Sequence, residues 1–232
     1  MKDVTAEEVT VDAVVVRAMF TAEQAATVDL ARDVAPEQWA RPSLCSEWSV
    51  RDVLAHAARH IHSGGWRETT DISGKRAARR ERALTEATVE GMIDALAAPA
   101  PAATRGLRGM AKLNTCELVI HQQDVRRPLG MERAFPEATL RMCLDFTTTP
   151  LGNLGVADRG RRLGRGLRLV ANDVAWSKGT GPCVTGTAEA ILMAIAGRPA
   201  AAEELTGPGQ PVLAARLGAT TMPVGADSVG RA

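Results

Sequence analysis

Two side chains near the middle of the chain have the spacing of metal ligands. Glu117 and His121 lie four residues apart, and on a helix this spacing places a carboxylate and an imidazole on one face, about one turn apart. His56, in an earlier helical segment, could supply a third ligand. Three protein ligands leave a coordination position open for water or substrate, which is typical of a catalytic zinc ion. A histidine that simply packs in the core is the other interpretation of such a pattern.

Two further histidines follow His56. His60 lies four residues after it, so its ring could point into the same site or cover that site from outside. His62 follows at the end of the segment. The other interpretation of His60 and His62 is that they are exposed or supporting residues of this helix.

Three charged residues come directly after His121. Asp124 lies almost one helical turn further on and could accept a hydrogen bond from a ligand imidazole, which would orient the ring. A salt bridge to Arg126 or Arg127 at the helix end is an equally good interpretation of Asp124. The two arginines could anchor carboxylates of a thiol or a substrate. Alternatively, they are surface residues at a helix C-terminus, where the helix dipole favours positive charge.

Helical patterns position all of these residues. Apolar residues recur at steps of three and four in five segments, which are residues 9–34, 50–61, 86–98, 113–126 and 136–146. Ser49, with Asp52 three residues later, is typical of a helix N-cap, and Pro128 should stop the fourth helix. The first four helices, joined by loops, predict an up-and-down four-helix bundle over residues 1–150.

The sequence changes character beyond Pro150, where several glycines interrupt any long helix. Residues 167–171 alternate as in a strand, residues 177–182 are typical of a turn, and residues 183–186 could form a second strand. A helix is expected over residues 187–196 and a loose tail after Leu217. We therefore expect a mainly α protein with a small α+β part, in which residues 151–232 form a small αβ domain with a flexible tail.

Composition excludes several classes of protein. The 232 residues contain 28 Lys and Arg against 27 Asp and Glu, a balance that argues against binding nucleic acid through bulk positive charge. The chain contains no apolar run long enough to span a membrane, and acidic residues stand near the N-terminus, where a signal peptide would be apolar. The four cysteines are widely spaced, which disfavours a disulfide framework. These features predict a cytoplasmic protein, either monomeric or homodimeric.

Three stretches of the sequence resemble a known family. Residues 39–56, from Trp39 to His56, resemble the signature of the DinB-like superfamily in its mycothiol-dependent maleylpyruvate isomerase branch. Residues 117–130 are similar to the motif on the fourth helix of that branch. Segments of the C-terminal part, from residue 171 to residue 207, resemble the small αβ domain of these proteins. The resemblance covers about residues 10–217.

The resemblance implies a metal-dependent enzyme. It makes His56, Glu117 and His121 the ligands of a divalent metal ion, usually zinc, and it makes mycothiol the thiol cosubstrate. A metal-bound thiolate would attack a small electrophile, in a transferase or a cis–trans isomerase. Asp124 and Arg126 are then candidate catalytic residues, and Arg126 and Arg127 are candidate contacts of the thiol.

One segment departs from the family pattern. The connection over residues 64–112 is short and contains a basic run at residues 75–82, which is either an anion contact or a solvated face. Because this connection would shape the substrate cavity, the electrophile is expected to differ from maleylpyruvate. A binding module without turnover and a metal-dependent hydrolase that needs no thiol are the competing interpretations.

Overall fold

The chain forms two compact units, residues 1–146 and residues 147–232. A computed structural model describes residues 6–45, 47–62, 79, 82–100, 108–150 and 160–220. Each unit has its own buried apolar residues. Of the predicted basic run, only Arg79 and Arg82 lie within the described residues, and both side chains are exposed.

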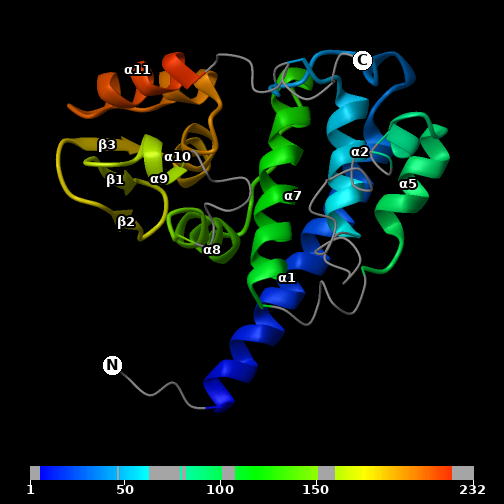
Figure 1. The fold of residues 1–232 in the computed structure, drawn as a ribbon, viewed down its shortest axis with the longest axis horizontal. Helices are drawn as coiled ribbons and strands as arrows, with labels where there is room; N and C mark the ends of the chain where they lie inside the picture. Colours follow the sequence, from blue (N-terminus) through cyan, green and yellow to red (C-terminus); the bar gives the residue numbers. More distant parts are fainter. Residues whose placement is uncertain are drawn as a thin grey trace, which may run out of the picture. The chain divides into compact units, whose positions relative to one another are not determined.

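Unit 1 is the predicted helical bundle. Its helices are α1 (Ala6–Asp33), α2 (Val50–Ile61), α5 (Val89–Ala97) and α7 (Arg108–Leu129), with a short 3-10 helix at Pro36–Gln38 and the later helix α8 (Glu137–Thr147). Both α5 and α7 pack against α1 and α2, and Figure 1 shows α2 and α7 side by side. The mainly helical fold class is confirmed.

Large aliphatic side chains fill the centre of the bundle. They come from all four helices, and the most deeply buried are Leu30, Leu54, Ile61, Met92, Leu96 and Leu118. The burial of these side chains drives the helices together. Since α2 and α7 each bury one face, residues on the edge of that face are brought close to the partner helix.

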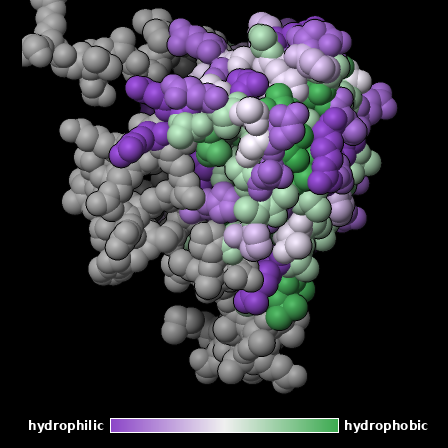
Figure 2. Space-filling view, turned by 90° about the vertical axis from the view of Figure 1, so that its right-hand side faces the viewer, coloured by the Kyte–Doolittle hydropathy of each residue, from purple (hydrophilic) through white to green (hydrophobic). Residues whose placement is uncertain are grey.

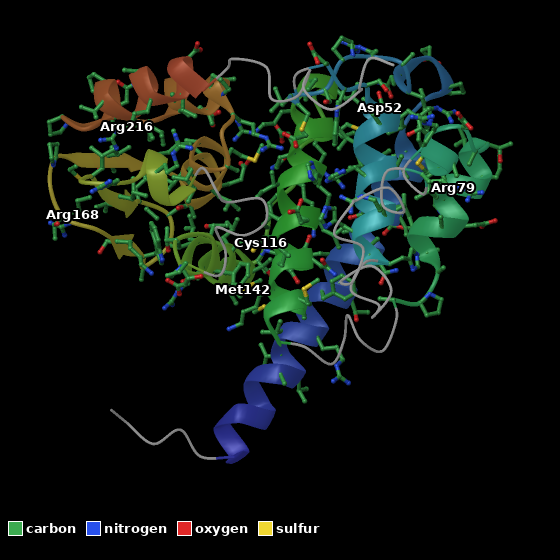
Figure 3. The ribbon with its side chains drawn as sticks, viewed as in Figure 1. Asp52, Arg79, Cys116, Met142, Arg168 and Arg216 are labelled. Carbon is green, nitrogen blue, oxygen red and sulfur yellow. The ribbon has the colours of Figure 1, made fainter. Side chains whose placement is uncertain are left out.

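The start of α2 follows the prediction from the sequence. Ser49 is the N-cap: its side chain accepts a hydrogen bond from the Asp52 N–H, and the Asp52 carboxylate accepts one from the Ser49 N–H at 2.9 Å. Figure 3 shows Asp52 near the beginning of this helix. The reciprocal pair satisfies two N–H groups that a helix start leaves without partners.

The end of α7 differs from the prediction. The helix continues to Leu129 and contains Pro128, although Pro128 was expected to stop it at residue 126. A proline in the last turn removes only one helical N–H, and the carbonyl that loses its donor is that of Asp124. The Leu44 N–H donates to this carbonyl at 3.0 Å. The loop between α1 and α2 is thereby fastened to α7.

Unit 2 contains a small sheet and short helices. Strand β1 (Arg168–Ala171) lies between β2 (Ser177–Lys178), to which it is antiparallel, and β3 (Cys183–Gly186), to which it is parallel. The surrounding helices are α9 (Gly160–Leu163), α10 (Ala188–Ile195), a 3-10 helix at Pro199–Glu204 and α11 (Gln210–Thr220).

Two predictions for unit 2 were wrong. Ser177 and Lys178 were expected in a turn, but they pair with Val170 and Leu169 as β2. The expected loose tail after Leu217 begins later, because α11 continues to Thr220. In both places the element is stabilised by packing onto a neighbour that the local pattern does not show.

The outer face of the bundle is mixed in character. Figure 2 shows hydrophilic residues in purple interspersed with hydrophobic residues in green on the side of α5. Among the described helices, none has the length and apolar content needed to cross a lipid bilayer.

Candidate metal centre

The three predicted ligands meet between α2 and α7. His56 lies on α2 and the other two residues lie on α7, and each offers a ligand atom within 4.8 Å of the other two. Nε2 of His121 is 3.1 Å from Oε2 of Glu117, and the ring centres of His56 and His121 are 4.9 Å apart. Glu117 and His121 are buried, and His56 is partly exposed. The group combines buried ligands with one that borders solvent.

His60 lies beside this group. Its Nε2 is 3.9 Å from Oε2 of Glu117, and its ring centre is 4.6 Å from that of His56. The Arg59 guanidinium bridges the two rings, with Nη2 at 2.8 Å from Nε2 of His60 and 3.4 Å from Nδ1 of His56. His62 points elsewhere: its Nε2 is 2.7 Å from the Ala95 carbonyl on α5.

Asp124 contacts the imidazole of His121 from the opposite side. Its Oδ2 lies 2.9 Å from Nδ1 of His121, and the Cys45 thiol donates to the same oxygen at 3.1 Å. With a proton on Nδ1, the ring donates to Asp124 and turns the lone pair of Nε2 toward Glu117 and His56. This is the tautomer that a metal bound at Nε2 requires.

Cys45 therefore does more than pack. Sequence reasoning treated it and Cys116 as core residues, and Cys45 does contact the bundle core. Cys45, His121 and Asp124 also form a second group of closely spaced candidate ligand atoms. Cys116 lies buried on α7 (Figure 3), and burial raises the pKa of its thiol. None of the four cysteines forms a disulfide.

The charges in the group are strongly coupled. Burial disfavours a charged His121, but its hydrogen bonds to Asp124, Cys45 and Glu117 outweigh burial and raise its pKa well above the ordinary value. Burial likewise works against an ionised Glu117, yet the imidazoles of His60 and His121 hold its pKa at about 2. Burial lowers the pKa of His60 to about 3. At neutral pH the group thus holds an anionic carboxylate and a neutral His60.

An aromatic side chain from the loop before α2 covers the histidines. The ring of Trp48 is centred 4.7 Å from that of His56 and 6.4 Å from that of His121. Sequence reasoning did not assign Trp48 to the site. Its position within the motif at residues 39–56, close to the first ligand, is the signal that could have identified it.

The predicted anchor Arg126 lies on another face of α7. It is five residues from His121, and a helix turns by about 100° per residue. The charged groups that influence the pKa of Arg126 are Arg133 and three acids of α1, while burial lowers that pKa. The structure therefore does not bring Arg126 together with the three candidate ligands. Arg127 is partly exposed in the last turn of α7.

The donor set suits a divalent cation. Two imidazole nitrogens and one carboxylate oxygen are the ligand types that Zn²⁺ uses in three-ligand sites, and Asp124 supplies the supporting hydrogen bond that such histidines usually make. The fold and this cluster together define a helical bundle with a candidate three-ligand metal centre.

Comparison with known proteins assigns this bundle to a family. Residues 20–126 match the mycothiol maleylpyruvate isomerase N-terminal domain, so this part of the chain belongs to that domain family. All three candidate ligands lie inside the matched region. Among curated proteins none matches the sequence.

Two solved structures share the fold. A crystal structure of the mycothiol-dependent maleylpyruvate isomerase matches with a TM-score of 0.60 and 14% identity, over 85% of this chain and 93% of that chain. A crystal structure of a histidine-to-alanine mutant of that enzyme matches over the same shares, with a TM-score of 0.58 and 14% identity. These similarities confirm the predicted fold and the resemblance to the family.

Proposed function

We propose that the protein binds a divalent metal ion, with Zn²⁺ as the best fit, through His56, Glu117 and His121. In this proposal it acts as a mycothiol-dependent S-transferase or cis–trans isomerase on a small electrophile. The observation that carries the proposal is the buried group of three ligand atoms within 4.8 Å of one another, in a domain of the mycothiol maleylpyruvate isomerase family.

The chain's own residues would prepare the site. Asp124 holds a proton on Nδ1 of His121 and so presents Nε2 as a ligand atom. Glu117, whose pKa is held at about 2, is ionised without any change of pH. Trp48 covers the imidazoles on one side. A divalent cation held by these residues would lower the pKa of a thiol at its open position, which makes a thiolate available at neutral pH.

Two reactions are compatible with such a thiolate. In a transfer, the sulfur forms a bond to an electrophilic carbon, that bond remains, and the electron pair displaced from the substrate takes up a proton or departs with a leaving group. In an isomerisation, the sulfur adds to a cis double bond, the new single bond rotates, and elimination returns the thiol with a trans product. The short connection at residues 64–112 favours a substrate other than maleylpyruvate.

Several finer points stay predictions from the sequence. Asp124 is proposed as the residue that orients His121. A role of Arg126 and Arg127 in binding carboxylates of the thiol or substrate is a further prediction, although Arg126 has its charged neighbours on the side of α1. A cytoplasmic location and a monomeric or homodimeric state are predicted on the same basis.

Metal content tests the ligand set. Native mass spectrometry of the protein is expected to show about one metal ion per chain, as for other three-ligand zinc sites, and His56→Ala should lose it. His62→Ala is the matched control, because His62 lies on the same helix end but contacts the Ala95 carbonyl. A Glu117→Ala/His121→Ala double variant that still binds a full complement of metal would refute the ligand set.

A thiol titration tests the activity class. We expect mycothiol to raise the melting temperature of the metal-loaded protein and to have no effect on His56→Ala. Turnover of an electrophile only in the presence of the thiol would support the transferase or isomerase. Turnover without thiol would instead identify a hydrolase, and a thiol response without turnover of any electrophile would identify a binding module.

A further inference from the structure

A second polar side chain of α7 lies in line with the candidate ligands. Asn114 precedes Glu117 by three residues and His121 by seven, so the three side chains share one stripe of the helix. With a rise of about 1.5 Å per residue, Asn114 lies about 4.5 Å along the axis from Glu117. Leu118, four residues after Asn114, belongs to the bundle core, so this stripe faces the interior.

The Asn114 amide is buried and unsatisfied. Its side chain has no exposed surface, and neither Oδ1 nor Nδ2 has a hydrogen-bond partner in the part of the chain that the structure describes. Burying an amide without partners costs free energy. Natural proteins keep such a group where a ligand or an ordered water completes its hydrogen bonds.

The register of the two helices leaves α2 short of Asn114. His56 on α2 lies next to His121, and His60, one turn later, lies next to Glu117. The helices are thus antiparallel, and one more turn of α2 would face Asn114. However, α2 ends at Ile61. The helix that supplies neighbours to the two ligands of α7 supplies none at this level.

We infer that Asn114 binds the amide group of the thiol whose sulfur reaches the candidate metal centre. An asparagine side chain offers an acceptor and two donors, and an amide of the ligand presents the complementary donor and acceptor. A carboxylate would leave Oδ1 without a donor, and an alkyl group would satisfy neither atom. A thiol built on an acylated cysteine carries an amide a few bonds from its sulfur, which fits the short step between Glu117 and Asn114. This inference rests on the proposed function.

Two thiols separate this role from a purely structural one. Calorimetry on the zinc-loaded full chain would compare N-acetyl-L-cysteinamide with propane-1-thiol, which has no amide. The wild-type protein is expected to bind the amide thiol more tightly, by about tenfold for a well-formed pair of hydrogen bonds. Asn114→Leu, of similar size, should bind both thiols alike while retaining its metal and its melting temperature.

The controls make each outcome decisive. Asn114→Asp keeps an acceptor but loses both N–H donors, so it should reduce the preference as well, and it serves if Asn114→Leu does not fold. Thr115→Val removes a neighbouring buried hydroxyl that bonds only to the Ala111 carbonyl of its own helix among described contacts, and it should keep the preference. An unchanged preference in Asn114→Leu would overturn the inference alone. A wild-type protein that binds neither thiol would overturn the proposed function as well.

Discussion

His121 uses its two ring nitrogens for different purposes. Nδ1 faces Asp124 at 2.9 Å, whereas Nε2 faces Glu117 at 3.1 Å. The carboxylate on the Nδ1 side determines which tautomer the ring adopts. A third residue, Cys45, donates to the same oxygen of Asp124. Asp124 therefore connects the loop before α2 with the ligand on α7.

Replacement of Asp124 by Asn should weaken metal binding. The variant keeps the size of the side chain but loses the charge that favours a proton on Nδ1. Loss of such a supporting partner typically costs about 10- to 100-fold in metal affinity, and competition with a chromophoric chelator would measure it. Asp52→Asn is the control, because Asp52 caps α2 and should change stability without changing metal affinity. Equal affinities for Asp124→Asn and the wild type would contradict the proposed role.

The metal-free protein should be most stable near pH 6.5. The pKa of His121 is raised above its ordinary value of 6.5, so its stabilising contribution is complete below that pH and is lost as the pH rises through the folded-state pKa. The pKa of His60 is lowered from 6.5 to about 3. Its neutral form is favoured by the fold, so stability falls as the pH drops from 6.5 toward 3. Glu117 adds a further loss between its ordinary value of 4.5 and about 2.

Chemical denaturation across this pH range would test both limbs of the curve. His121→Gln should flatten the loss of stability above pH 6.5, and His60→Gln should flatten the loss below it. The opposite assignment of the two limbs would show that the protonation states are reversed.

At the scale of elements, a buried ion pair joins α1 to the segment after α7. Arg133 donates to both carboxylate oxygens of Glu23, at 2.7 and 3.1 Å, and it also donates to Gln122. Gln122 in turn donates to Glu23 at 3.0 Å. The Arg133 guanidinium also lies 4.4 Å from the ring centre of Phe135. Residues from three segments thus satisfy one buried carboxylate.

Arg133→Met should destabilise the bundle strongly. It would leave the Glu23 carboxylate, which is 1% exposed, buried without its charged partner, at a cost of about 3 kcal/mol or more. Arg32→Met is the control on the same helix, because the Arg32–Asp29 pair is exposed and such pairs contribute little. Urea denaturation of the three proteins would measure both effects. A small loss for Arg133→Met would show that Glu23 is solvated or protonated.

Local signals in the sequence were sufficient for some of these elements and not for others. The cap at Ser49 and the spacing of Glu117 and His121 lie within one helical turn, so the pattern predicts them directly. The partners Glu23 and Arg133 are 110 residues apart, and no local pattern relates them. The same is true of the contact between Leu44 and the Asp124 carbonyl, which is why α7 could continue through Pro128.

At the scale of the whole molecule, the candidate centre belongs to unit 1 alone. Its residues lie between Cys45 and Asp124, inside residues 1–146. The resemblance between short motifs was therefore enough to predict the three ligands. Asn114 and Trp48 were not predicted, because burial without a partner and the contact of a ring with an imidazole appear only once the helices are packed.

Removal of the metal should weaken the bundle selectively. A ligand that binds only the folded state contributes about 4 kcal/mol when its free concentration is about 1,000 times its dissociation constant. Hydrogen exchange of the zinc-loaded protein, with and without a chelator, should show faster exchange in α2 and α7 and unchanged exchange in α10. The Glu117→Ala/His121→Ala variant should not respond to the chelator. Equal changes in α10 would contradict a site confined to unit 1.

The position of Trp48 has an optical consequence. The chain contains four tryptophans and no tyrosine, so its ultraviolet emission is essentially that of indole. The indole of Trp48 lies 4.7 Å from the ring of His56 and 6.4 Å from that of His121, close enough for a cation on those imidazoles to alter its excited state. The protein thus carries an intrinsic fluorophore beside its candidate metal centre, and occupancy can be followed by light emission without any added dye.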